Sequence, residues 1–297
     1  MENQKTKWWL KPLIYLLFVF LVAVTAKVDW AAEHPSSGYL FRYFWLIFLL
    51  SLGFVLPLVF MYFAGNQLSE RKESDTKMFI LALILFAIAN GIPIIFYVVL
   101  GLSPGFFLFL QLALFGLVPT FIYQPKQSKM RIIILILLAA AILIPLTVLV
   151  DTAINPIWAN PHNHSYLGEL FPVLRTDKTL YYLFFWGLFS VFLYFIIAIG
   201  WKFGGGTKRG SWNIFMAGML VQYSTLEDFL YFILNNQNLP GEWPWLENFV
   251  INLVALFGRV PTDLDLLLFC VIINTIALFI LYDGHGYLYE KFILKNM

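Results

Sequence analysis

The chain has 297 residues, of which 61% are hydrophobic, 19% aromatic and only 12% charged. Soluble domains carry about 25% charged residues, so this composition excludes an ordinary soluble protein and predicts a membrane protein. The net charge of +2 is small and the basic residues do not cluster, which argues against nucleic acid as a partner. The single cysteine, Cys270, cannot form an intramolecular disulfide and gives no information on the redox compartment.

The apolar segments predict an all-α integral membrane protein with a single polytopic domain. A helix needs about 20 apolar residues to cross a hydrocarbon core of about 30 Å, because lipid offers its backbone no hydrogen-bond partners. Eight segments meet this requirement: residues 9–26, 41–65, 78–102, 104–123, 131–150, 180–201, 212–234 and 264–282. A ninth apolar stretch, residues 246–257, is too short to span and is predicted to be re-entrant or interfacial.

The basic residues predict the orientation, because cytoplasmic loops carry an excess of Lys and Arg. With the N-terminus in the cytoplasm, most of the 19 basic residues fall on the inner side and most of the 17 acidic ones in the outer half. We therefore expect a cell-membrane protein with both termini in the cytoplasm and an outer half that attracts cations. One alternative concerns the first segment. Its lysines, apolar core and Val24-Thr25-Ala26 also fit a cleaved signal peptide, which would leave seven spans.

Two adjacent carboxylates, Glu227 and Asp228, fall inside the predicted span 212–234. A carboxylate near the bilayer centre costs about 2.5–3.5 kcal/mol, so such residues usually face protein or water and have a function. Helical spacing places Ser224 and Tyr231 on the face that both acids share. These four residues are predicted to bind a ligand, because such acids can bind a cation, relay a proton or act as a general acid. The structural alternative is an ion pair with Arg259 that locks two spans together.

The segment before the last span adds further candidates for the same ligand-binding site, namely Arg259, Asp263 and Asp265. Their alternative role is helix capping. Thr262 followed three residues later by Asp265 fits a capping box, and acids suit a helix N-terminus. Asp263, Cys270 and Asn274 share one helical face, and we expect that face to be turned toward protein.

Signals for a cofactor or for catalysis are weak. His162 and His164 lie two residues apart on a predicted outer loop and are weak candidates for metal ligands. No Ser/His/Asp or Cys/His arrangement can be assembled, so the sequence predicts no catalytic residues and identifies no cofactor.

Two short stretches resemble the acidic motif of membrane lycopene cyclases, in which a proline and paired acids precede aromatic and aliphatic residues. They are Glu227-Asp228-Phe229-Leu230-Tyr231-Phe232-Ile233-Leu234 and Gly258-Arg259-Val260-Pro261-Thr262-Asp263-Leu264-Asp265. In that family the acids are thought to protonate a polyene and start ring closure. The resemblance therefore implies cation-driven chemistry on an apolar substrate. The first stretch lacks the proline, and the second separates its acids by a leucine.

Three functional hypotheses follow. The first is a binding or transport protein of the lipid bilayer, with a small solute or cation reaching Glu227 and Asp228 from outside. The second is an intramembrane enzyme that uses the same acids on a lipid or isoprenoid. The third is a structural or assembly subunit in which the acids only hold helices together. The acidic outer half favours the first hypothesis.

Overall fold

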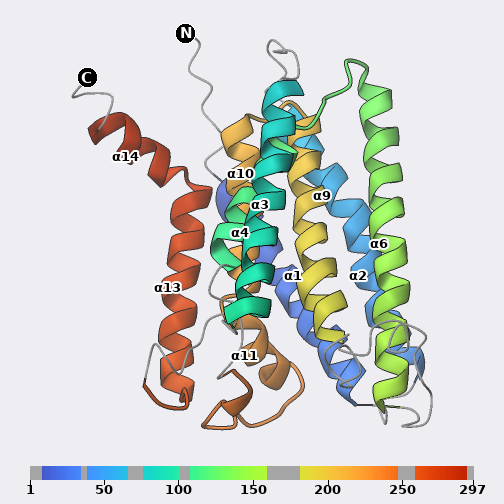
Figure 1. Ribbon diagram of the computed structural model, residues 1–297. Coiled ribbons are helices and arrows are strands. Elements are labelled where there is room, and N and C mark those ends of the chain that lie inside the picture. Colours follow the sequence, from blue (N-terminus) through green and yellow to red (C-terminus); the bar gives the residue numbers. More distant parts are fainter. Residues whose placement is uncertain are drawn as a thin grey trace.

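The computed structural model describes residues 9–34, 39–65, 76–100, 108–158, 181–246 and 258–292. This part of the chain forms a bundle of helices (Figure 1), with an isolated β-bridge between Glu242 and Thr262. The helices are α1 (Leu10–Glu33), α2 (Tyr39–Ala64), α3 (Thr76–Leu100), α4 (Leu108–Phe115), α5 (Leu117–Phe121), α6 (Ser128–Trp158), the π-helix η5 (Tyr182–Phe189), α9 (Ser190–Phe203), α10 (Lys208–Gln222), α11 (Leu226–Ile233), the 3-10 turn η6 (Pro244–Leu246), α13 (Asp263–Leu281) and α14 (Gly284–Phe292).

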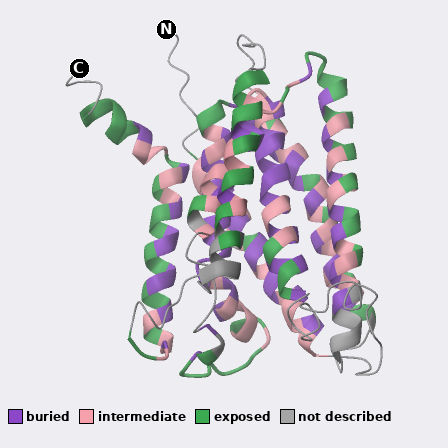
Figure 2. Ribbon diagram, in the orientation of Figure 1, coloured by how far each residue is buried: buried purple, intermediate pink, exposed green. Residues whose placement is uncertain are grey.

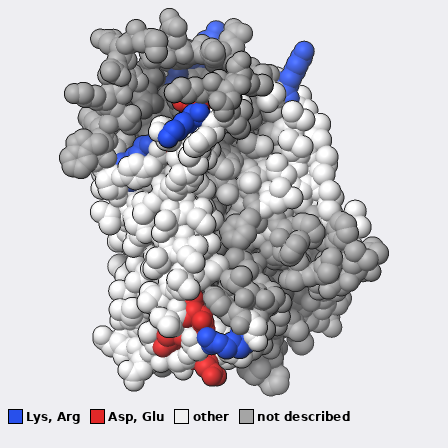
Figure 3. Space-filling view, turned by 90° about the vertical axis from the view of Figure 1, so that its left-hand side faces the viewer, with Lys and Arg blue, Asp and Glu red and all other residues white. Residues whose placement is uncertain are grey.

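The length and composition of the apolar helices indicate a membrane protein. Within the described residues, five helices are long and apolar enough to cross a membrane: Leu10–Glu33, Leu40–Ala64, Ser128–Asp151, Tyr182–Phe203 and Asp263–Leu281. Two shorter apolar helices are Thr76–Ile92 and Leu110–Phe121. Side chains turned away from the bundle are exposed although many are apolar, as at Leu264, Leu268 and Ile272 of α13 (Figure 2). Figure 3 shows a broad uncharged surface between charged groups at two ends, which fits lipid around the middle of the bundle.

The predicted spans agree with the helices in part. The first helix continues past the predicted end at Ala26 as far as Glu33. The predicted span 104–123 contains the two short helices α4 and α5, and the predicted span 212–234 is divided between α10 and α11. The predicted short helix at 246–257 lies outside the described residues except for Leu246. The count of eight spans therefore stays a prediction.

A close crossing of α2 and α9 lies at the centre of the bundle. Nearly every residue of α9 is buried, and Gly200 and Gly204 lie one turn apart on it. A Cβ atom at Gly200 would overlap the carbonyl oxygen of Pro57, and one at Gly204 would overlap that of Met61. Small residues spaced in this way let the backbones of membrane helices approach closely. The two glycines therefore determine how near α2 and α9 can lie.

The two ends of the bundle differ in their polar groups. Lys11 Nζ lies 5.1 Å from the centre of the Tyr282 ring, so α1 begins where α13 ends. We call this the basic end, because Arg131 and Arg209 also belong to it. The opposite end, where α1 finishes at Glu33, is called the acidic end.

Arg131 is a buried anchor at the basic end, 1% exposed. Its Nη1 donates to the carbonyl oxygen of Phe203 at 2.8 Å and its Nε to that of Pro125 at 2.6 Å. Phe203 is the last residue of α9, so the guanidinium satisfies a carbonyl group that the helix leaves without a partner.

Replacing Arg131 by Met is expected to lower the free energy of unfolding by about 2–4 kcal/mol, because buried carbonyl groups lose a charged donor. Chemical unfolding in detergent measures this change. Lys129→Met is the matched control, since Lys129 is exposed on the same helix and its loss should cost no more than about 0.5 kcal/mol. Equal effects of the two variants would contradict the anchoring role.

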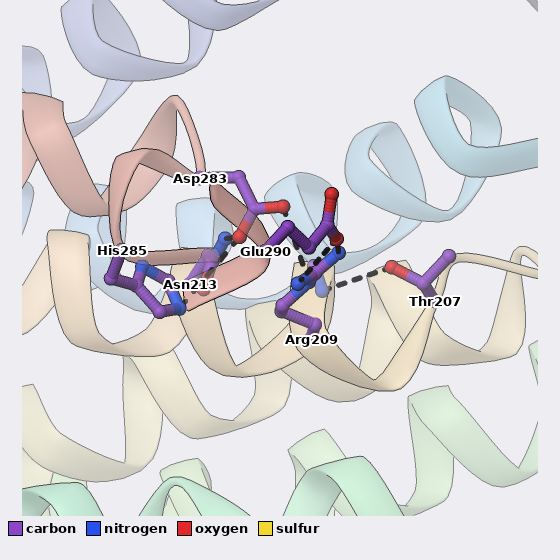
Figure 4. A network of polar contacts seen from close by, with 7 residues as sticks. Thr207, Arg209, Asn213, Asp283, His285 and Glu290 are labelled. Carbon is purple, nitrogen blue, oxygen red and sulfur yellow. Dashed lines mark hydrogen bonds and ion pairs between the residues drawn. The ribbon is translucent and has the colours of Figure 1, made fainter. Parts of the chain in front are cut away.

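A charge-compensated network links α10 to the turn between α13 and α14 at the basic end (Figure 4). Arg209 Nε lies 3.1 Å from Asp283 Oδ2, and Arg209 Nη2 lies 3.3 Å from Glu290 Oε1. Asn213 Nδ2 donates to Asp283 Oδ1 at 3.2 Å, and His285 Nε2 is 3.7 Å from the same oxygen. Each acid of this network therefore has a basic partner.

Candidate acidic site at a helix break

The predicted span 212–234 is interrupted next to its two acids. Helix α10 ends at Gln222 and α11 begins at Leu226. Thr225 between them has φ +64°, a left-handed conformation that is unfavourable for a β-branched residue. Ser224 therefore lies outside the helix that carries both acids, and the prediction was wrong for this residue. Tyr231 lies on α11 one turn after the two acids, as helical spacing predicted. Non-Gly residues in this conformation persist only where the surroundings hold them, and they cluster at functional sites.

A buried amide on α13 holds one side of the break. Asn274 Nδ2 donates to Ser224 Oγ at 2.9 Å, and Asn274 Oδ1 accepts from Tyr15 of α1 at 2.9 Å. The Thr225 hydroxyl also donates a hydrogen bond to the carbonyl oxygen of Leu266, at 3.3 Å. Asn274 is 8% exposed, so the predicted orientation of its face toward protein is confirmed at this residue.

A second set of contacts holds the end of α10. Gln222 accepts from Tyr194 of α9 at 3.2 Å through Oε1 and donates to Thr25 of α1 at 3.2 Å through Nε2. The hydroxyl of Tyr223 donates to the carbonyl oxygen of Trp186 at 2.7 Å. Trp186 belongs to the π-helix η5, and π-helical turns often occur at functional sites. Helices α1, α9 and α13 together with η5 thus stabilise the break from several sides.

Replacing Asn274 by Leu is expected to reduce the free energy of unfolding by about 2–4 kcal/mol, because the half-buried hydroxyl of Tyr15 and the buried hydroxyl of Ser224 each lose a partner. A double-mutant cycle with Tyr15→Phe should give a coupling of about 1 kcal/mol in detergent unfolding. Thr275→Val, at the exposed neighbouring position, is the control and should be nearly neutral. Additive effects of Asn274→Leu and Tyr15→Phe would contradict the contact.

Four carboxylates meet beside the break at the acidic end. Glu227 is 6% exposed, and its Oε1 has no hydrogen-bond partner within the described part of the chain. The charges that act on Glu227 are those of Asp29 and Glu33 from α1 and of Asp228 from α11. Asp29 and Glu33 are one turn apart, so both point from α1 toward the same side.

Two tyrosine hydroxyls each donate a hydrogen bond to one of the carboxylates of α1. Tyr181, which directly precedes η5, donates to Asp29 Oδ1 at 2.5 Å. Tyr231 on α11 donates to Glu33 Oε2 at 2.7 Å. The ring of Tyr231 lies edge-on to that of Trp30, with centroids 5.1 Å apart. Aromatic rings and carboxylates therefore occur together at this site.

Basic residues near this end are engaged elsewhere. Lys27 Nζ donates to the carbonyl oxygen of Leu234 and to Asn235 Oδ1, both at 2.7 Å, and so caps the end of α11. Arg259 Nη1 lies 2.8 Å from Asp265 Oδ2, which does not support the ion pair between Arg259 and the Glu227–Asp228 pair. Neither Lys27 nor Arg259 contacts Glu227 among the described residues.

The remaining predicted site residues form the start of α13. Thr262 and Asp265 make the capping box that the sequence predicted, with Asp265 Oδ2 accepting from the Thr262 backbone at 2.9 Å. Asp263 Oδ1 accepts from Trp243 Nε1 at 2.6 Å. Asp263 and Asp265 thus have structural contacts, and Arg259 forms an ion pair with Asp265. Whether they also contact a ligand stays a prediction.

The sequence missed Asp29, Glu33 and Tyr181, which the structure brings to Glu227. The spacing of Asp29 and Glu33 was the available signal, but the apolar run ends before them. The predicted metal ligands His162 and His164 lie outside the described residues. Among the residues that are described, no group of three or more His, Cys, Asp or Glu could hold a metal ion.

Comparison with known proteins gives no relative: no family model, no curated protein and no solved structure matches this chain. The function must therefore be argued from the acidic site itself.

Proposed function

We propose that this chain is a cell-membrane binding or transport protein whose acidic site takes a small cationic solute from the outer side. The site consists of Asp29, Glu33, Glu227 and Asp228. The observation that carries the proposal is the buried Glu227 Oε1, which has no hydrogen-bond partner among the described residues. The charges of three further carboxylates also act on Glu227. Burying a charge without a partner is costly, so a ligand that supplies positive charge fits this arrangement.

An organic ammonium ion fits better than a metal ion. The carboxylates are not arranged as a metal-binding group within the described residues. Trp30 and Tyr231 place aromatic rings beside Glu33, and cations are attracted to the faces of such rings. Carboxylates together with aromatic rings suit a ligand that carries both a positive charge and apolar groups.

The broken helix supports transport. In many transporters the substrate binds where a membrane helix is discontinuous, because the unwound backbone offers polar groups there. The proposed topology has about eight spans with α10 and α11 forming one of them, and places both termini in the cytoplasm. The proximity of Lys11 and Tyr282 supports an even number of crossings between α1 and α13.

Native mass spectrometry of the gently purified protein tests the proposal. We expect a bound cationic solute in the wild type that is lost from the folded variant Glu227→Gln/Asp228→Asn. The control is Glu242→Gln, which removes a carboxylate from an exposed position near the same end. A neutral lipid or isoprenoid that depends on the two acids would favour an intramembrane enzyme. No ligand in any form, together with an unstable double variant, would favour a structural role.

A further inference from the structure

Among the described residues, the groups around Glu227 give no counter-charge to its carboxylate. The titratable side chains of this part of the chain that act on the site come from α1, the start of η5, α11 and α13: Asp29, Glu33, Tyr181, Tyr182, Asp228, Tyr231 and Cys270. These are carboxylates, phenols and one thiol, so they are negative or neutral. An ionised Glu227 would therefore lie in a buried place next to like charges, which is costly.

Two basic side chains near the site, Lys27 and His34, make contacts with other groups. Lys27 on α1 is directed to the far end of α11, where it donates to Leu234 and Asn235. His34 stacks on Trp30 at a centroid distance of 3.5 Å, and its Nδ1 lies 3.0 Å from the Trp30 carbonyl oxygen. Within the described residues, neither contact brings a positive charge to Glu227.

The acids of α1 are poor places for an additional proton. Asp29 and Glu33 each accept a hydrogen bond from a tyrosine hydroxyl, at 2.5 and 2.7 Å. Hydroxyl donors bind most strongly to ionised carboxylates, so these two contacts favour keeping Asp29 and Glu33 charged. Asp228 is less buried than Glu227. Glu227 is consequently the member of the site that gains most from being neutral.

Building on the proposed function, we infer that Glu227 holds a proton while the site is empty and exchanges it for the cation that binds. In this exchange the O–H bond of the Glu227 carboxyl group breaks and the proton leaves to water. The carboxylate that remains becomes the counter-ion of the bound ammonium group. The net charge of the site is the same before and after, and no electron is transferred.

The exchange makes cation binding depend on pH in a defined direction. A proton and the cation compete for the same carboxylate, so lowering the pH weakens cation binding. While Glu227 is protonated in the empty site, the dissociation constant should increase about tenfold for each unit that the pH falls. A transporter with such a site would couple movement of the cation to a proton gradient.

The test uses the full-length protein in detergent with benzyltrimethylammonium chloride as the probe. Titration in weakly buffered solution with a pH indicator should show about one proton released for each probe ion bound. Infrared difference spectroscopy should show the carbonyl band of a protonated carboxyl group that disappears when the probe binds. This band should be absent from Glu227→Gln and present in Glu242→Gln.

The outcomes separate the exchange from the proposed function. If the probe binds without releasing protons and with an affinity that pH does not change, the exchange is wrong and the cation site stands. If the probe does not bind to the folded wild type at any pH, the proton exchange and the proposed cation site are both overturned for this class of cation. A carboxyl band that persists in Glu227→Gln would assign the proton to another residue and overturn the inference.

Discussion

Replacing Gly200 by Ala is expected to lower the free energy of unfolding by about 3 kcal/mol or more. The added Cβ would overlap the carbonyl oxygen of Pro57 and lie 2.8 Å from its carbonyl carbon. Backbone atoms of a helix cannot rotate away as the end of a side chain can, so α2 and α9 must move apart. Because α9 is buried on all sides, that movement disturbs its other contacts as well.

A series of Gly→Ala variants measures this effect in detergent unfolding. Gly204→Ala should be similarly destabilising, since its Cβ would overlap the Met61 carbonyl oxygen. Gly91→Ala on α3 is the control, because its Cβ would meet no atom within 4 Å. This variant should be neutral or more stable by about 0.5–1 kcal/mol, as alanine favours helix. Equal effects at Gly200 and Gly91 would show that the close crossing does not limit stability.

The features predicted correctly from the sequence are those determined locally. Apolar length predicts where long helices lie, because a helix in lipid must satisfy its own backbone groups. The start of α13 was also predictable, since its cap needs only Thr262 and Asp265. Both signals are complete within one short stretch of chain.

The break at Thr225 could not be predicted in this way. Ser224 accepts from Asn274 of α13, and Gln222 donates to Thr25 of α1, so side chains from distant segments hold the break. A contiguous apolar pattern therefore indicates one helix where tertiary hydrogen bonds support two. Asp29 was missed for a related reason: α1 continues past its apolar run while packed beside α11, and Tyr181, far along the chain, donates to its carboxylate.

The two polar ends of the bundle suggest different roles for their acids. At the basic end, Asp283 and Glu290 are both paired with Arg209, an arrangement that can hold helices together without any ligand. At the acidic end, Glu227 Oε1 is buried and has no hydrogen-bond partner among the described residues, while Lys27 and Arg259 contact other groups. If the acidic site existed only for stability, neutralising it should weaken the fold.

We expect the opposite from the double variant Asp29→Asn/Glu33→Gln. Cation binding should weaken about 30-fold or more, since two of the charges that attract the ligand are lost. The free energy of unfolding should be unchanged or should rise by up to about 1 kcal/mol, because like charges one turn apart are removed. The amide oxygens can still accept from Tyr181 and Tyr231, so these two hydrogen bonds are retained.

Parallel measurements of binding and unfolding decide between the two roles. The control Glu242→Gln changes the net charge of the same end by one but lies outside the site, so it should leave binding within about twofold of the wild type. A loss of more than about 2 kcal/mol in stability with unchanged binding would mean that Asp29 and Glu33 hold α1 against α11. A stable variant that no longer binds the cation would instead mean that the negative charge of this site serves its ligand, and that the fold tolerates this charge at a cost in stability.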